Sequence, residues 1–120
     1  MKSYKDLEIY QLAFDLAVRI YHLSMTLPNP YTYETGSQIR RSSQSVKDAI
    51  VEGYGRRRYK ADFLKYLVYS HASLLESKSQ SEFLNKIHND NGWSDISIEL
   101  DLLGIKIFNF IAYVEENWKS

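Results

Sequence analysis

The chain contains no cysteine, only two prolines and only five glycines among its 120 residues. The lack of cysteine excludes disulfide bonds, thiolate nucleophiles and cysteine metal ligands. Because proline and glycine are the residues that most often interrupt helices, their scarcity favours long elements. Both prolines fall within three positions, at Pro28 and Pro30, where they predict one sharp break in the chain.

The chain also lacks a long uninterrupted hydrophobic run. Its most apolar stretch, residues 96–114, is broken by four charged or amide side chains, which argues against a membrane span. Residues 1–11 carry four charges and no apolar core of signal-peptide length. With 44% apolar and 25% charged residues the composition is that of a soluble globular protein. We therefore expect one cytoplasmic domain over residues 1–120 that does not contact a membrane.

Apolar residues recur every three or four positions in four segments, which is the spacing of one face of an α-helix. These segments cover about residues 6–27, 35–57, 59–89 and 94–118. The last is ambiguous, because residues 96–108 also alternate as in a strand, but no other segment offers a strand to pair with. The sequence therefore predicts an all-α fold, an antiparallel up-down four-helix bundle.

Three details of these helices can be tested. Thr35 followed by Gln38 fits a capping box at the start of the second helix, and Ser94 is the expected N-cap of the fourth. The third helix carries a stripe at heptad spacing with a polar middle, made of Phe63, Leu67, Ser70, Leu74, Ser77, Ser81, Leu84 and His88. Apolar residues of the fourth helix lie off its main stripe, which favours burial in a homo-oligomer; they are Ile98, Leu102, Ile105 and Ile111.

Charge is balanced overall but unevenly spread. Residues 37–60 hold seven basic and two acidic side chains, a net charge of +5, whereas residues 90–120 hold six acidic and two basic ones, a net charge of −4. The two regions can neutralise each other or form opposite ends of an assembly. Either arrangement argues against broad, non-specific nucleic-acid binding.

Three stretches resemble a known family. They are "YKDLEIYQLAFDLAVRIYHL" at the start, "SQIRRSSQSVKDAIVEGYGR" and "FLKYLVYSHASLLESKSQ", so the resemblance covers at least residues 4–80. The pattern is similar to that of the proteins encoded in the intervening sequences of bacterial 23S ribosomal RNA genes. The resemblance implies a four-helix bundle that assembles into a ring-like homopentamer, with a molecular role that is largely uncharacterised. A related branch, the accessory variability proteins of diversity-generating retroelements, binds nucleic acid and a reverse transcriptase with this bundle, but those relatives are strongly basic.

The basic run has two interpretations, one structural and one functional. Polar residues at helical spacing on the second and third helices can form a layer that fixes register and partner choice. The candidates for this polar layer are Gln38, Arg41, Ser45, Glu52, Arg56, Ser73 and Glu76. The remaining charges lie with aromatic residues at the turn between the two helices, a combination that suits single-stranded RNA. The candidate nucleic-acid contacts are Arg40, Tyr54, Arg57, Arg58, Tyr59 and Lys60.

Catalysis finds little support in the sequence. The three histidines, His22, His71 and His88, do not form a metal-binding pair at helical spacing, and the glycines of "EGYGRR" lack the strand and the lysine of a phosphate loop. We expect no enzyme, no metal and no cofactor. The leading hypothesis is a homo-oligomer that binds RNA or a nucleic-acid-processing protein. The alternative is a protein-binding or structural scaffold without nucleic-acid contact.

Overall fold

Helices account for most of the computed structural model, which describes residues 2–88 and 91–119. A short 3₁₀-helix, η1 (Tyr4–Asp6), precedes four long α-helices: α1 (Glu8–Met25), α2 (Thr35–Gly55), α3 (Lys60–Ile87) and α4 (Asn91–Asn117). The described residues contain no strand, so the all-α prediction is confirmed. The alternating pattern of residues 96–108 is helical and lies within α4.

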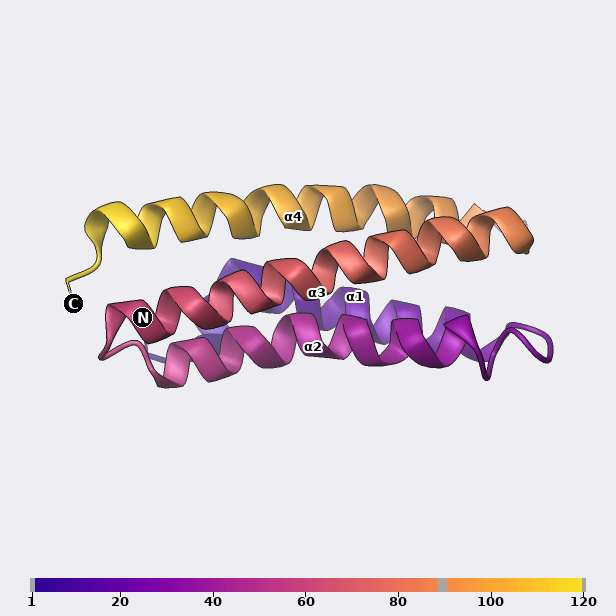
Figure 1. Cartoon of the computed structure of the whole chain (residues 1–120), viewed down its shortest axis with the longest axis horizontal. Helices are drawn as coiled ribbons and strands as arrows, with labels where there is room; N and C mark the ends of the chain where they lie inside the picture. The colour runs from indigo at the N-terminus through magenta and orange to yellow at the C-terminus, as the bar shows by residue number, and fades with distance from the viewer. Residues whose placement is uncertain (1, 89–90, 120) are drawn as a thin grey trace.

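The four long helices lie side by side along a molecule of 48 × 20 × 20 Å (Figure 1). Each long helix contacts two others: α2 packs against α1 and α3, and α4 packs against α3 and α1. The contact of α2 with α3 is the most extensive and that of α1 with α4 the least. The side of the molecule between α1 and α4 is therefore the most open.

The predicted stripe of α3 faces the core, including its polar middle. All seven members from Phe63 to Leu84 are buried, while His88 is half-buried. Buried hydroxyls need hydrogen-bond partners, and the serines find them on neighbouring helices. Ser70 donates to the Val46 carbonyl of α2 at 2.7 Å, and the Ser81 hydroxyl lies 2.6 Å from that of Ser97 on α4.

Both predicted helix caps are wrong. The N-cap of α2 is Glu34, whose side chain makes no capping hydrogen bond. The first turn instead uses a loop carbonyl, since the Gly36 N–H donates to the Tyr31 oxygen at 2.9 Å. That approach requires glycine, because a Cβ on Gly36 would lie 2.9 Å from the same oxygen. Ser94 is not the N-cap of α4, because the helix begins at Asn91 and already includes it.

A capping box does occur at η1, where none was predicted. The Ser3 hydroxyl accepts from the Lys5 N–H at 3.1 Å, and the Asp6 carboxylate accepts from the N–H groups of Lys2 and Ser3 at 2.8 and 3.1 Å. These backbone donors, that of Lys2 first, lower the pKa of Asp6 below its usual value of 3.8. The signal was the spacing Ser-x-x-Asp at residues 3–6.

Three of the four apolar residues that lie off the main stripe of α4 are on the surface, whereas Ile111 is half-buried and packs against the core. Ile98, Leu102 and Ile105 are each more than half exposed, at 57, 56 and 58%. Between α1 and α4 the surface opens into a cavity of about 670 Å³, here called the α1/α4 groove. Its apolar lining comes from Leu12, Phe14, Leu16, Val18, Leu102 and Leu103. Two ion pairs cross this side of the molecule, Arg19 with Glu99 and Glu8 with Lys106.

Candidate nucleic-acid interface and polar hollow

The turn between α2 and α3 holds most of the candidate nucleic-acid contacts. Residues 56–59 connect Gly55 to Lys60, and backbone hydrogen bonds close the connection, including one from the Tyr59 N–H to the Arg56 oxygen at 2.9 Å. The three arginines of this turn follow directly on the C-terminus of α2, where positive charge is favourable to the helix dipole. The short, hydrogen-bonded connection and the favourable helix dipole thus hold a dense group of cations at one end of the molecule.

Arg57 is the most firmly held of these cations. Its guanidinium lies 3.9 Å from the centre of the Tyr54 ring and donates to the Tyr54 carbonyl at 2.9 Å. The Trp118 indole N–H donates to the Arg57 carbonyl at 3.1 Å, which ties the end of α4 to the turn. Tyr54 is only 7% exposed, so its ring supports Arg57 and offers no free face to a base.

Arg58 and Tyr59 project more freely. Both are exposed, Tyr59 at 62%, and the Arg58 guanidinium lies 5.9 Å from the Tyr59 ring centre. Lys60 is half-buried, and its ammonium donates to the Glu115 carbonyl near the end of α4 at 2.6 Å. The turn therefore presents one open cation–aromatic pair beside two cations that also serve the fold.

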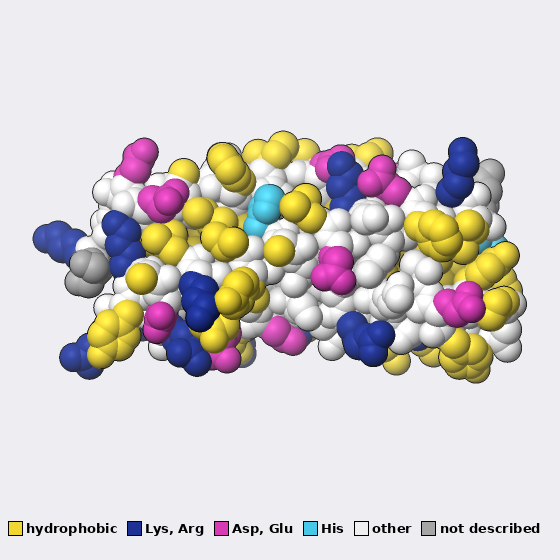
Figure 2. Space-filling model, viewed as in Figure 1, with side chains coloured by type: hydrophobic (Ala, Val, Ile, Leu, Met, Phe, Trp, Pro, Cys, Tyr) yellow, Lys and Arg dark blue, Asp and Glu magenta, His cyan; other side chains and the backbone are white. Residues whose placement is uncertain are grey.

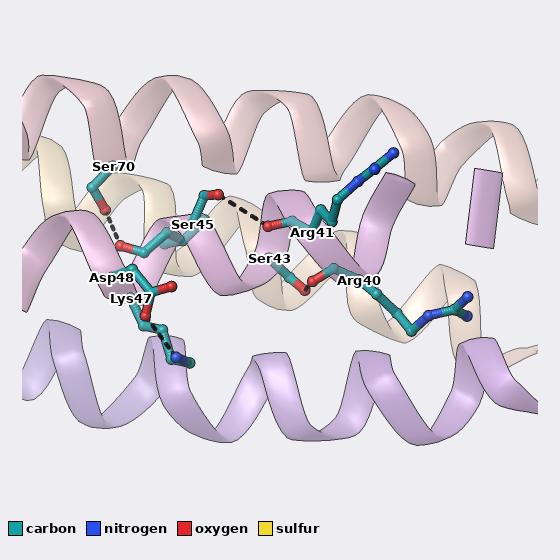
Figure 3. A network of polar contacts seen from close by, with 8 residues as sticks. Arg40, Arg41, Ser43, Ser45, Lys47, Asp48 and Ser70 are labelled. Atoms are coloured by element: carbon teal, nitrogen blue, oxygen red, sulfur yellow. Dashed lines mark hydrogen bonds and ion pairs between the residues drawn. The ribbon is translucent and has the colours of Figure 1, made fainter. Parts of the chain in front are cut away.

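Arg40 lies away from the turn and holds the loop between α1 and α2. Its guanidinium donates to the Ser24 hydroxyl at 2.9 Å and to the Thr32 carbonyl at 2.8 Å. Ser24 is fully buried and Thr32 is 9% exposed, so these partners have little access to water. In Figure 3 the side chains of Arg40 and Arg41 point in different directions, and that of Arg41 extends toward α3.

The candidate polar layer divides into two groups. Arg56 lies near the turn with its Nε 3.7 Å from Glu52 and its Nη1 4.0 Å from Asp62, and it covers the Tyr66 ring at 4.9 Å. These carboxylates and Arg56 are exposed or half-exposed, so each ion pair contributes less than about 1 kcal/mol. Neither Glu52 nor Arg56 is a member of a buried layer.

The other five members meet farther along the same two helices, at a polar hollow of about 350 Å³. They are Gln38, Arg41 and Ser45 from α2 with Ser73 and Glu76 from α3. Two further lining residues, Ser42 and Gln80, were not predicted from the sequence. Their signal was helical spacing, since Ser42 lies one turn beyond Gln38 and Gln80 one turn beyond Glu76. In Figure 2 the surface over the middle of α2 and α3 is mostly white, the colour of the backbone and of uncharged polar side chains, with only isolated charged groups.

Lys78, which lies on α3 outside the hollow, has a raised pKa. Its ammonium lies 2.5 Å from the Asp101 carboxylate across the contact of α3 with α4, and this interaction raises the pKa of Lys78. Within the described residues no group of three or more His, Cys, Asp or Glu side chains is placed to hold a metal ion. Over the same residues, no helix has both the length and the apolar character needed to cross a bilayer.

The model of the family described as 23S rRNA-intervening sequence protein matches residues 5–91. The chain belongs to this family. Among curated proteins, none matches the sequence. The region matched to the 23S rRNA-intervening sequence protein family contains α1, α2 and α3, and therefore both the turn and the polar hollow, whereas nearly all of α4 lies beyond it.

Proposed function

We propose that this 23S rRNA-intervening sequence protein binds single-stranded RNA through the turn between α2 and α3, by binding chemistry alone and without catalysis. The observation that carries the proposal is the exposed pair of Arg58 and Tyr59, flanked by Arg57 and Lys60. A guanidinium contacts phosphates, and an exposed tyrosine ring gives a base a surface to stack on. We leave Tyr54 and Arg40 out of the proposed surface, because Tyr54 is buried and the Arg40 guanidinium is engaged in the loop.

The proposal includes an antiparallel up-down arrangement of the four helices. Contacts between α2 and α3 support it, because Ser42 meets Ser77 while Val46 meets Ser70, so partner numbers fall on one helix as they rise on the other. Contacts between α1 and α4 follow the same rule, with Glu8 on Lys106 and Arg19 on Glu99. In this topology the turn between α2 and α3 lies at one end of the bundle.

We also propose that the protein is a cytoplasmic homo-oligomer, and that the oligomer is the ring-like pentamer that family membership suggests. The support is the exposed apolar surface along α1 and α4. Phe14, Val18 and Met25 on α1 are 42–54% exposed, and Leu102 on α4 is 56% exposed beside the α1/α4 groove. A second copy is the occupant favoured here, because such a surface is costly to leave in water. A ring would repeat the basic turn several times, and multivalency would raise the affinity for one RNA strand.

The test is RNA binding across a salt series, with the assembly mass measured by light scattering. We expect the wild-type affinity for a partly single-stranded RNA to fall as salt rises, because binding releases counterions. Arg58→Glu should weaken binding and flatten the salt dependence, while Lys86→Glu, a charge reversal near the far end of α3, should do so much less. Leu102→Glu should reduce the assembly mass.

Each outcome separates the proposals. Absence of RNA binding at low salt by an intact oligomer would reject the RNA-binding function and favour a protein-binding or structural scaffold. An unchanged mass for Leu102→Glu would reject the α1/α4 groove as the assembly surface. Equal losses for Arg58→Glu and Lys86→Glu would mean that the turn has no special role.

A further inference from the structure

The polar hollow between α2 and α3 has a fixed floor. The buried Ser42 hydroxyl lies 2.7 Å from the Ser77 hydroxyl and donates to the Gln80 Oε1 at 2.7 Å. Because Oε1 is oriented toward Ser42, the Gln80 amide nitrogen keeps two donors that have no partner among the described residues. The floor therefore orients a neutral hydrogen-bond donor that the fold itself does not use.

The hollow is also lined by two charged side chains of opposite sign that do not pair with each other. Arg41 comes from α2 and Glu76 from α3, and both are exposed. Within residues 2–88 and 91–119, neither the Arg41 guanidinium nor the Glu76 carboxylate has an ion-pair or hydrogen-bond partner. A fork of N–H donors and a carboxylate with two acceptor oxygens thus face one polar cavity.

This combination selects among ligands by chemistry. A phosphate offers only acceptors, and the Glu76 carboxylate would repel it, while a metal cation would be repelled by Arg41. A ligand that satisfies both must carry adjacent acceptors and adjacent donors. Guanine fits, because its O6 and N7 atoms suit a bidentate arginine and its N1–H and N2–H groups suit a carboxylate.

We propose that the polar hollow holds an unstacked guanine, with Arg41 on its Hoogsteen edge and Glu76 on its Watson–Crick edge. The inference deepens and rests on the proposed RNA-binding function, since the same strand would contact the turn. Sequence-specific recognition of RNA commonly reads bases that are splayed out of a single strand in this way. The turn would then supply affinity for the strand, and the hollow would supply the preference for guanine.

Aromatic residues connect the two places along one face of α3. Tyr69 follows Tyr66 by three positions and precedes Ser73 by four, so the three residues share a stripe of α3 that continues to Glu76. Their rings meet edge to face at 5.4 Å, with Arg56 over Tyr66 at 4.9 Å and Lys65 beside Tyr69 at 5.9 Å. From Arg41 to Arg56 the helix rises about 22 Å, which about six stacked nucleotides would span.

The experiment compares oligouridine with the same strand carrying one internal guanosine. We expect guanosine to raise the affinity roughly tenfold. Inosine, which lacks the N2 amino group, and 7-deazaguanosine, which lacks N7, should each lose part of this gain. Glu76→Gln and Arg41→Lys should abolish the guanosine preference. Arg41→Lys keeps the charge but removes the fork, whereas Glu76→Gln also removes a carboxylate that repels phosphate, so its oligouridine affinity is compared with that of a second Glu→Gln variant. Glu82→Gln, on an exposed part of α3 outside the hollow, is the matched control.

A strand that binds without guanosine preference, or a preference that both variants retain, would overturn the hollow proposal and leave the RNA-binding turn in place. If no strand binds, the RNA-binding function is rejected, and binding of guanosine monophosphate then tests the hollow separately. A shift of the Gln80 side-chain amide NMR signal with guanosine but not uridine monophosphate would then support the hollow. No shift would overturn it as well.

Discussion

Replacing Arg40 by methionine should destabilise the protein without weakening RNA binding, although the sequence makes Arg40 a candidate RNA contact. Methionine keeps an apolar stem and removes the guanidinium that donates to Ser24 and Thr32. A hydrogen bond from a charged group contributes about 1.5–3 kcal/mol, and a half-buried site lies at the lower end. Two bonds at that end sum to an expected loss of about 3 kcal/mol in the free energy of unfolding. For a chain of this size that corresponds to a fall in Tm of about 9–15 °C.

Arg58→Met is the matched control, because it makes the same chemical change at an exposed side chain with no hydrogen bond in the described structure. Its stability should stay within about 0.5 kcal/mol of wild type. Its RNA affinity should fall, and the slope of log K against log salt should shrink by about 0.7 for each phosphate that the protein no longer neutralises. The two variants should thus have opposite effects in thermal unfolding and in RNA binding. An unchanged Tm for Arg40→Met, or a fall in RNA affinity equal to that of Arg58→Met, would refute this division of roles.

Three further changes test the packing and the electrostatics. Gly53→Ala should lower the free energy of unfolding, measured by urea titration, by up to about 2 kcal/mol, because its Cβ would meet Tyr66 at 3.1 Å and overpacking outweighs the gain in helix propensity. Gly55→Ala, with open space around it, should be neutral or stabilising in the same measurement. In an NMR titration the pKa of Asp6 should lie below its usual value of 3.8. Because its pKa is lowered in the folded state, the ionised carboxylate stabilises the fold at neutral pH, and this contribution is lost as the pH falls through the folded-state pKa. The free energy of unfolding of Asp6→Asn should therefore differ from that of wild type at neutral pH and approach it in acid. Glu76→Ala should leave the free energy of unfolding unchanged within about 0.5 kcal/mol, because the carboxylate is exposed, and a larger loss would mean that Glu76 has a partner in the assembly.

The core was predictable because its signal is repeated. The heptad spacing from Phe63 to Leu84 identified seven buried positions, serines included, since each position adds weight to the same face. Helix caps depend on two or three residues, and here the loop overrode them. The Tyr31 carbonyl accepts the hydrogen bond of a backbone N–H in the first turn of α2, so the Thr35 and Gln38 side chains do not cap the helix.

The candidate site was only partly predictable, because sequence spacing places residues on a face but does not identify their partners. Spacing alone grouped Glu52 and Arg56 with Glu76. The structure places the first two near the turn and Glu76 at the polar hollow. The sequence makes Lys60 a candidate nucleic-acid contact, and in the structure its ammonium donates to the carbonyl of Glu115, 55 positions away in the chain. Such distant backbone acceptors leave no trace in a local pattern.

The proposed recognition surface depends on the contact of α2 with α3, the most extensive helix contact in the described structure. A Cβ on Gly53 would approach both Phe63 and Tyr66, and Ser42 and Ser70 bridge α2 and α3 by hydrogen bonds, so small residues let these helices meet closely. Because buried hydroxyls are satisfied in only one alignment, these bonds fix the register of α2 against α3. The same register brings Arg41 and Glu76 to one hollow and sets the turn at the end of the pair. The interface between α1 and α4 is less extensive and combines apolar side chains with two ion pairs. The assembly proposed there would therefore leave the register of α2 against α3 undisturbed.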